Sequence, residues 1–319
     1  MSVDKRFDVL AIGELNADFI FTGLKQGPVL NNEIIAENYK KTMGSSTALC
    51  ACNVARIGLK VAFCGKVGDD DIGQFVLNDL ENRKINTGFC IVDPSVETGI
   101  TLALNWGGDR AMVTVLGATG TLSLDDFDIS IIQSTRHLHV GSFYMNTGIR
   151  KDLKNIFIKA KEWGISTSLD TGWDVNETWE DDILPVLEYT DVFIPNETEA
   201  MHIVKAATLE EAATELEKIC TKTVAIKCGK KGGLLLAGGK RYAIDAMDDV
   251  KVVDTTGAGD SFNAGFLYGY LKGLPLPTCL EYGNACGNIS VGTVGGTGAD
   301  LDEDKIIAMI ESHSRCREL

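Results

Sequence analysis

Short apolar runs alternate with amphipathic runs through most of this 319-residue sequence, and this alternation narrows the choice of fold more than any other feature. The apolar runs have the length of buried strands, and the amphipathic runs place apolar side chains at helical spacing. We expect strands over residues 7–13, 60–68, 137–143, 164–170, 190–196 and 221–229. We expect helices over residues 47–58, 70–83, 148–163, 197–204 and 208–220. This order predicts an α/β fold, a doubly wound, mostly parallel sheet with helices on both faces, in a single domain over residues 1–319.

Two segments interrupt the alternation because neither has a helical pattern. Residues 18–43 look extended. Residues 98–117 read as two strands on either side of the turn Gly107–Asp109, as in a hairpin. Both segments lie between α/β elements, so we expect a small, discontinuous β-sheet lid built from about 15–43 and 97–118.

The charge and cysteine content of the chain limit its partners and its compartment. It has 30 Lys and Arg against 45 Asp and Glu, a formal net charge of −15. Nucleic acids and anionic membranes attract clustered basic residues, so we expect neither as a partner. The first apolar run stops at Glu14 and no later run is long enough to span a membrane, so we expect no signal peptide or membrane segment. Nine scattered cysteines without a CxxC motif indicate reduced thiols and a cytoplasmic protein.

The segment 250–273, VKVVDTTGAGDSFNAGFLYGYLKG, carries the clearest chemical signal. We expect a strand that ends at Asp254, then a glycine turn, then a helix. Gly257 and Gly259 let the backbone approach a ligand closely, and the unpaired N–H groups of a helix's first turn attract an anion. Asp260 lies in that first turn. It either accepts the proton of an attacking hydroxyl in phosphoryl transfer or only caps the helix, and the spacing leaves both roles open.

Several motifs, in order along the chain, resemble those of the ribokinase-like (PfkB-type) carbohydrate kinases. The run Asp254–Asp260, DTTGAGD, resembles the signature of that family. The other matching segments are Gly13–Asp18, Gly44–Gly58, Gly65–Gly73, Pro195–Glu199 and Gly229–Gly233. Together they extend over nearly the whole chain. The resemblance implies the ribokinase-like fold and an ATP-dependent kinase that phosphorylates a hydroxymethyl group of a small sugar or polyol.

The resemblance also implies a role for individual residues. Asp260 would be the catalytic base, beside an anion hole formed by the amides of Gly257, Ala258 and Gly259. The acceptor's hydroxyls would be held by Asn16, Asp18, Gly44 and Ser45. ATP and Mg²⁺ would be bound by Asn196, Glu199, Lys227, Gly229, Gly232 and Asn284. Glu199 would reach Mg²⁺ partly through water, and Asn284, at the start of a helix, would approach the adenine. A K⁺ site, as in many members of the family, would match Asp254, Thr256, Ser290, Thr293 and Gly295.

The same residues leave simpler interpretations open. Asn16 and Asp18 directly follow a buried strand, where open α/β sheets bind ligands, but short polar residues also form turns there. Asn196 and Glu199 have the spacing of a capping box, a role that is compatible with ATP binding. Asp170 follows the central strand, and it either supports the ATP side of the site or caps a helix.

Weaker signals come from aromatic, histidine and acidic residues. Trp106 and Trp173 are candidates to stack on a sugar, although packing is the more common role of a tryptophan. His137 and His139 share one face of a strand without the acidic or cysteine cluster that a metal site needs. The runs 69–71 and 302–304 predict the acidic starts of two helices.

The acceptor side departs from the family pattern at three positions. Leu49 stands where the family usually has an asparagine, Ser45 stands at the second glycine of its glycine pair, and Thr119 stands at the end of its Gly-Ala-Asn motif. A lost polar contact disfavours the substrate hydroxyl that it would otherwise pair with. Ribose therefore fits less well than a rarer sugar, a polyol or a nucleoside.

Two other functions stay open. A nucleoside kinase on the same scaffold would need an aromatic clamp, for which Phe143, Trp106 or Phe21 are candidates. A non-catalytic sensor of a sugar or nucleotide would have no need of the intact GAGD motif. The exposed lid sheet also predicts a homodimer.

Overall fold

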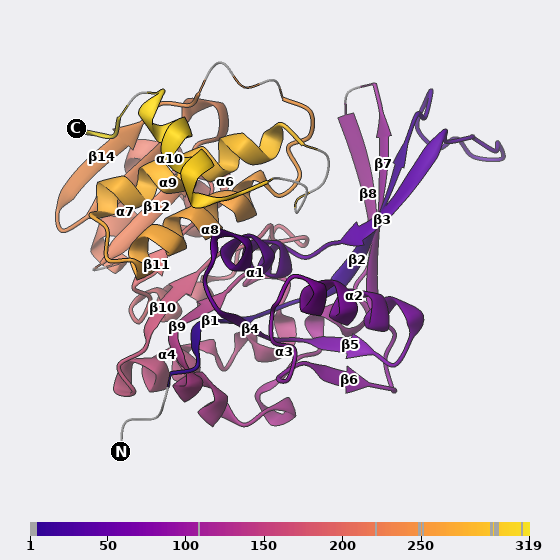
Figure 1. Ribbon diagram of the computed structural model, residues 1–319, viewed down its shortest axis with the longest axis horizontal. Coiled ribbons are helices and arrows are strands. Elements are labelled where there is room, and N and C mark those ends of the chain that lie inside the picture. The colour runs from indigo at the N-terminus through magenta and orange to yellow at the C-terminus, as the bar shows by residue number, and fades with distance from the viewer. Residues whose placement is uncertain are drawn as a thin grey trace.

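The alternation of apolar and amphipathic runs produces a nine-stranded sheet between two layers of helices, from which a second sheet projects (Figure 1). The computed structural model describes residues 5–107, 109–220, 222–247, 250, 252–293, 296, 300–313 and 315–319. No helix among them is long and apolar enough to cross a membrane. All nine cysteines are free thiols, as expected.

The large sheet is parallel over two thirds of its width. In spatial order its strands are β15 (Arg317–Glu318), β14 (Lys240–Ile244), β13 (Gly233–Ala237), β12 (Thr223–Lys227), β11 (Val192–Phe193), β10 (Ser166–Leu169), β9 (Thr135–Val140), β1 (Phe7–Ile12) and β4 (Val61–Cys64). Strands from β12 to β4 pair in parallel, and β13, β14 and β15 add an antiparallel edge. The predicted α/β fold is confirmed, but the sequence analysis did not predict the antiparallel edge.

Ten α-helices accompany the strands in the described part of the chain. They are α1 (Ser46–Ile57), α2 (Asp71–Asn82), α3 (Thr147–Arg150), α4 (Leu153–Glu162), α5 (Leu184–Leu187), α6 (Glu197–Ile203), α7 (Leu209–Ile219), α8 (Ala258–Leu271), α9 (Leu276–Val291) and α10 (Glu303–Glu311). Side chains of β1 alternate between the two faces of the sheet. Val9 and Ala11 join a core with α1, α2, α8, α9 and α10, whereas Leu10 and Ile12 join a core with α3 to α7.

The small sheet is the predicted lid, assembled from two distant pieces of the chain. Its order is β3 (Asn38–Met43), β2 (Asn16–Thr22), β7 (Gly99–Trp106) and β8 (Asp109–Val115), and it extends away from the main body in Figure 1. Beside its base lies a two-stranded parallel sheet of β5 (Lys66–Gly68) and β6 (Ile91–Asp93). Because β2 follows β1 after three residues, the lid begins directly above the carboxyl ends of the parallel strands.

Four expected boundaries are wrong. The expected strand over 60–68 is divided into β4, in the large sheet, and β5, in the two-stranded sheet. Residues 252–254 form no strand, since the amides of Val253 and Asp254 both donate to the carbonyl of Val291 at the end of α9. Helix α9 begins at Leu276, eight residues before Asn284, because proline at its start is compatible with the first turn. The expected helix over 148–163 is divided into α3 and α4 by a turn at residues 151 and 152.

Candidate active site

A tight glycine turn introduces helix α8 at the carboxyl edge of the large sheet. Gly257 caps the helix with a φ of 74°, in the left-handed region that favours glycine. A side chain would not fit either, because a Cβ on Gly257 would lie 2.4 Å from the Cα of Gly296. The N–H groups of the first turn have no partner within the helix. The Ala258 amide donates to the Thr255 carbonyl at 3.3 Å, and an anion hole formed by the amides of Gly257, Ala258 and Gly259 stays a prediction.

Asp260, in the first turn of α8, receives a hydrogen bond from the neighbouring helix. The hydroxyl of Ser46, the first residue of α1, donates to its Oδ1. Burial raises the pKa of the Asp260 carboxyl to about 7, and the negative charge of Asp170 adds to the effect of burial. The Ser46 hydrogen bond and the Lys227 ammonium act in the opposite direction. A carboxyl group with a pKa near neutrality can accept a proton under physiological conditions.

The four predicted acceptor-binding residues lie together where the lid joins the main body. The Oδ1 of Asn16 accepts a hydrogen bond from the Ser45 hydroxyl at 2.6 Å. The Nδ2 of Asn16 donates to Thr101 Oγ1 at 3.0 Å and to Asp18 Oδ1 at 3.3 Å. Gly44 has no room for a side chain, since a Cβ there would lie 2.3 Å from Asp18 Oδ1 and 2.4 Å from Asn16 Oδ1. Thr101, on β7 of the lid, is a member of this cluster that sequence reasoning missed.

Glu14 is a second residue that sequence reasoning missed. It is 5% exposed, and its carboxylate accepts from the Thr47 amide at 3.1 Å and from the Ser142 hydroxyl at 2.7 Å. These bonds tie the end of β1 to the start of α1 and to the residues after β9. The sequence could have identified Glu14 from its position just after a buried strand, because a carboxylate buried there needs several hydrogen-bond donors.

Lys227 connects the end of β12 to the end of β10. Its Nζ donates to Asp170 Oδ2 at 2.6 Å and to Asn263 Oδ1 at 3.2 Å. Burial alone would lower the pKa of Lys227, but the charges of Asp170 and Glu199 outweigh it and raise this pKa above its usual value. Burial likewise disfavours ionised Asp170, yet Lys227 keeps the pKa of that carboxyl below its ordinary value. The interpretation of Asp170 as a helix cap is wrong, because the described residues directly after β10 begin no helix; the Oδ1 of Asp170 instead accepts from the Gly172 amide at 2.9 Å in a turn.

Asn196 and Glu199 form the capping box that their spacing predicted. Asn196 Oδ1 accepts from the Glu199 amide at 2.9 Å, and Glu199 Oε2 accepts from the Asn196 amide at 2.8 Å. Glu199 Oε2 also accepts from the Thr171 hydroxyl at 2.7 Å. Burial raises the pKa of Glu199, and the nearby Asp170 adds to this rise. Capping therefore fixes a buried carboxylate next to the Lys227–Asp170 pair.

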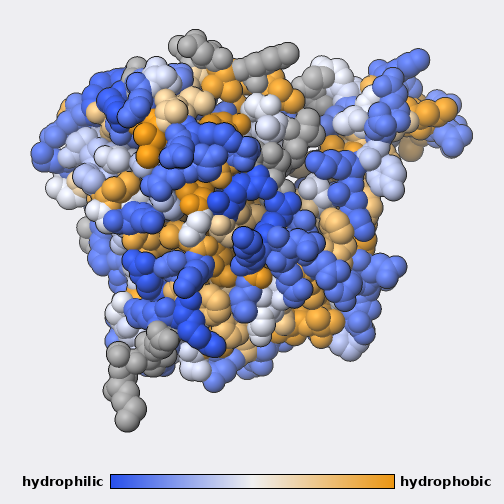
Figure 2. Space-filling model, in the orientation of Figure 1, coloured by the Kyte–Doolittle hydropathy of each residue, from blue (hydrophilic) through white to orange (hydrophobic). Residues whose placement is uncertain are grey.

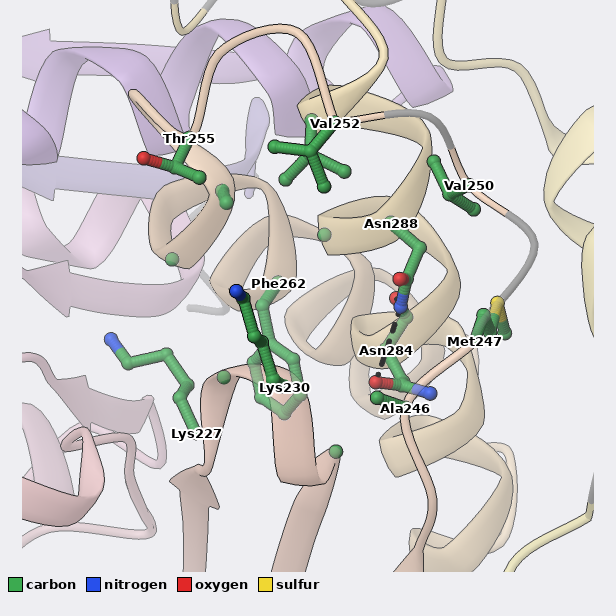
Figure 3. A pocket seen from close by; sticks show the side chains of 16 residues that line it. Lys227, Lys230, Ala246, Met247, Val250, Val252, Thr255, Phe262, Asn284 and Asn288 are labelled. Atoms are coloured by element: carbon green, nitrogen blue, oxygen red, sulfur yellow. Dashed lines mark hydrogen bonds between the residues drawn. The ribbon is translucent and has the colours of Figure 1, made fainter. Parts of the chain in front are cut away.

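A pocket of about 400 Å³ opens beside the glycine turn. Lys227, Ala258 and Gly259 line it toward the polar residues just described, while Gly229 and Gly232, in the loop after β12, line it as well. Its opposite end is formed by Ala246, Met247, Val250, Asn284, Asn288 and neighbouring residues of α9. Figure 3 shows Lys227 at one end of this space and Asn284 with Met247 at the other. The pocket thus has one largely apolar end and one polar end.

The candidate K⁺ residues lie together as far as the structure describes them. The loop 252–256 runs along the end of α9, where the carbonyl of Val291 accepts from the Asp254 amide at 3.2 Å. The Ser290 carbonyl, on the same helix, already accepts from the Thr293 hydroxyl at 3.1 Å. Thr256 donates its amide to Asp254 Oδ1 at 2.9 Å. Gly295 lies outside the described residues.

Several weaker sequence signals have structural roles. Phe143 is fully buried and Trp173 packs edge-on against Trp179. His137 and His139 hydrogen-bond to the Ser168 hydroxyl, and burial lowers their pKa values to about 3 and about 4. No cluster of His, Cys, Asp or Glu suited to a metal ion occurs among the described residues.

The acidic run 69–71 contributes a helix cap, as predicted. Asp70 accepts from the Gly73 amide at 2.7 Å at the start of α2. Asp302 caps α10 in the same way.

The model of the pfkB family carbohydrate kinases matches residues 6–303 of this chain. The chain belongs to that family. The match includes the glycine turn, both helices at the site and every strand of the lid. Kinases of this family transfer phosphate to hydroxyl groups of sugars, so the predicted family and enzyme class are confirmed.

Relatives differ in what they phosphorylate. An uncharacterized sugar kinase of Archaeoglobus fulgidus is 32% identical to this PfkB chain, and the alignment covers 72% of this chain and 91% of the relative. The adenosine kinase of Saccharomyces cerevisiae is 29% identical, and the alignment covers 78% of this chain and 77% of the adenosine kinase. An E. coli structure in complex with ATP and Mg²⁺ has a TM-score of 0.84 and 24% identity, and the alignment covers 96% of this chain and 100% of that chain. These findings identify a PfkB-family sugar or nucleoside kinase and leave its acceptor open.

Proposed function

We propose that this protein is an ATP-dependent kinase that transfers the γ-phosphate to a hydroxymethyl group of a small sugar or polyol. The observation that carries the proposal is the position of the turn 257–260 between two sites. Ala258 and Gly259 line the pocket proposed for ATP. The next residue, Asp260, is bonded to Ser46, and the adjacent Ser45 is bonded to Asn16 in the cluster proposed for the acceptor.

In this proposal Asp260 acts as the base. Its carboxylate takes the proton of the acceptor's hydroxyl while that oxygen attacks the γ-phosphorus of ATP. A new oxygen–phosphorus bond forms, the bond between the γ-phosphorus and the bridging oxygen breaks, and ADP leaves with the bond's electron pair. The amides of Gly257, Ala258 and Gly259 stabilise the negative charge on the moving phosphoryl group.

The pocket supports ATP as the phosphate donor. Its apolar end, near Asn284, suits a nucleobase, and Gly229 and Gly232 allow the backbone to approach closely. At the polar end, Lys227 offers a cation to the phosphates.

Asn196 and Glu199 suit a magnesium ion held partly through water. The Asn196 amide and the Thr171 hydroxyl both donate to Oε2 of Glu199. The other carboxylate oxygen, Oε1, is therefore available to a hydrated ion. Mg²⁺ would neutralise charge on the phosphates. For K⁺ we propose Asp254, Thr256, Ser290, Thr293 and Gly295, whose described members lie along the end of α9.

The acceptor site supports a hydroxylated ligand. Asn16 and Asp18 present short polar side chains to the space beside Gly44, which suits recognition of neighbouring hydroxyls. A nucleoside is less well supported, because Phe143, one candidate for an aromatic clamp, is fully buried. We further propose that the lid closes over the acceptor and excludes water, which would otherwise compete as the acceptor.

The test is an assay of ADP release with MgATP, with and without K⁺. The panel of acceptors contains aldoses, ketoses, deoxy sugars, sugar acids, inositols and nucleosides. We expect saturable turnover with at least one sugar or polyol. Turnover with nucleosides alone would move the assignment to a nucleoside kinase. No turnover with any acceptor, together with ATP binding in calorimetry, would contradict the proposal and favour a sensor.

A further inference from the structure

Asn53, near the middle of α1, is a polar side chain that the proposed mechanism does not use. It is 0% exposed and faces helix α8. Its Nδ2 donates to Ser261 Oγ at 3.0 Å and to the carbonyl of Gly296 at 3.3 Å. Its Oδ1 has no partner among the described residues. A buried amide that is only partly paired carries a cost in stability.

The first hydrogen bond leads to the glycine turn. Ser261 Oγ, which accepts from Asn53, donates to the carbonyl of Gly257 at 2.9 Å. This carbonyl belongs to the same peptide unit as the N–H of Ala258. Because a peptide unit is planar, the direction of the carbonyl fixes the direction of the N–H on its other side. The Ser261 amide also donates to this carbonyl at 2.9 Å, so Asn53 adds a second constraint, through the Ser261 side chain, on one of the three amides of the proposed anion hole.

The second hydrogen bond reaches the segment that packs on the same turn. A Cβ on Gly257 would lie 2.4 Å from the Cα of Gly296, so the two backbones are in close contact. Since Asn53 also holds the Gly296 carbonyl, a single amide group fixes both backbones. Movement of either would change how Gly257 presents its peptide groups.

We propose that Asn53 is a positioning residue for phosphoryl transfer, which fixes the peptide between Gly257 and Ala258 through Ser261 and Gly296. This inference rests on the proposed function of the Gly257–Gly259 amides. Asn53 touches neither substrate, so its loss affects the alignment of the anion hole rather than binding. Alignment matters because the amides stabilise charge that develops only in the transition state.

The test is the substitution Asn53→Leu, which keeps the side chain's size and removes its donors. We expect kcat to fall about 10- to 100-fold, while KM for ATP and for the acceptor changes less than about threefold. Ser261→Ala, at the other end of the link, should give the same pattern. The matched control is Cys52→Ala, on the same helix and 2% exposed, whose thiol lies near Asp79 and Arg83. It should lower Tm and leave kcat unchanged.

The double variant Asn53→Leu with Ser261→Ala tests the route. If both act through the Gly257 carbonyl, the combined loss in kcat stays well below the product of the two single losses. A loss in kcat of the double variant that equals the product of the two single losses would overturn that route. A kcat within twofold of wild type in folded Asn53→Leu would overturn the proposal itself. If Asn53→Leu does not fold, a wild-type kcat in Ser261→Ala overturns it.

The wild-type protein, assayed beside the variants, separates this inference from the proposed function. Absence of phosphoryl transfer in the wild type refutes the proposed function. Normal transfer in the wild type and in Asn53→Leu refutes only the role of Asn53.

Discussion

Asp260 illustrates how environment changes the chemistry of one side chain. An aspartate with an ordinary pKa of 3.8 would be a weak base, but burial beside Asp170 and Glu14 raises the pKa of Asp260 to about 7. The DTTGAGD motif identified the residue, whereas its partner Ser46 became visible only when α1 and α8 were placed side by side. Sequence spacing cannot show contacts between residues 214 positions apart.

The raised pKa predicts the pH dependence of the reaction. Since the base acts in its deprotonated form, kcat/KM should fall about tenfold per pH unit below the pKa near 7 and level off above it. The Ser46 hydrogen bond stabilises the ionised form, so Ser46→Ala should move this transition to higher pH. Ser45→Ala is the matched control, because Ser45 bonds to Asn16 and should alter the acceptor's KM without moving the transition. An unchanged transition in Ser46→Ala would contradict this account.

The same group should make the protein less stable at high pH. The pKa of Asp260 is higher in the folded than in the unfolded protein, so its stabilising contribution is complete below about 3.8 and is lost as pH rises through about 7. Asp260→Asn should therefore have a higher Tm than the wild type at pH 8, with a smaller difference near pH 5. Thermal unfolding at both pH values measures this. An equal or lower Tm at pH 8 would contradict the burial of an ionised Asp260.

At the scale of elements, the site depends on where strands end. Strands β1, β10 and β12 deliver Glu14, Asp170 and Lys227 to one edge of the sheet, as expected for an open parallel sheet. The sequence predicted these strands but not the pairing of Lys227 with Asp170, which requires knowledge of strand order. It also placed the start of α9 too late, because residues 279–286 of this helix are all buried and leave no clear amphipathic pattern.

The Lys227–Asp170 pair should contribute differently to stability and to activity. Lys227→Met leaves a buried carboxylate without its cation and should lower the free energy of unfolding by about 3–5 kcal/mol. Adding Asp170→Asn removes the unpaired charge and should restore much of that loss. Activity should stay low in both variants if Lys227 also binds phosphate. Denaturant unfolding and kcat/KM for ATP measure the two effects, and full recovery of activity in the double variant would exclude the role at the phosphates.

At the scale of the whole molecule, the lid leaves apolar side chains exposed to solvent. Val113 and Val115 of β8 are 59% and 52% exposed, and Figure 2 shows apolar residues among hydrophilic ones on the projecting sheet. The sequence predicted both pieces of the lid from their extended pattern. It could not indicate which residues the lid brings to the acceptor, because Thr101 reaches Asn16 only through the pairing of β2 with β7.

We propose that this exposed sheet pairs with a second copy of the chain. Val113→Glu with Val115→Glu should then convert a dimer into a monomer in analytical ultracentrifugation, because two buried charges oppose association. Substitution of the equally exposed Val175 by Glu, remote from the lid strands in sequence, is the control and should leave the dimer intact. A wild type that sediments as a monomer at micromolar concentration would contradict the proposal.

The central claim is that Asp260 removes the acceptor's proton during transfer of phosphate from ATP. The most direct measurement is kcat of Asp260→Asn with the best acceptor of the panel, alongside calorimetric binding of ATP. We expect ATP affinity close to that of the wild type and a kcat about 10²- to 10⁴-fold lower. A near-normal kcat in this variant would show that Asp260 is not the base and would contradict the proposed mechanism.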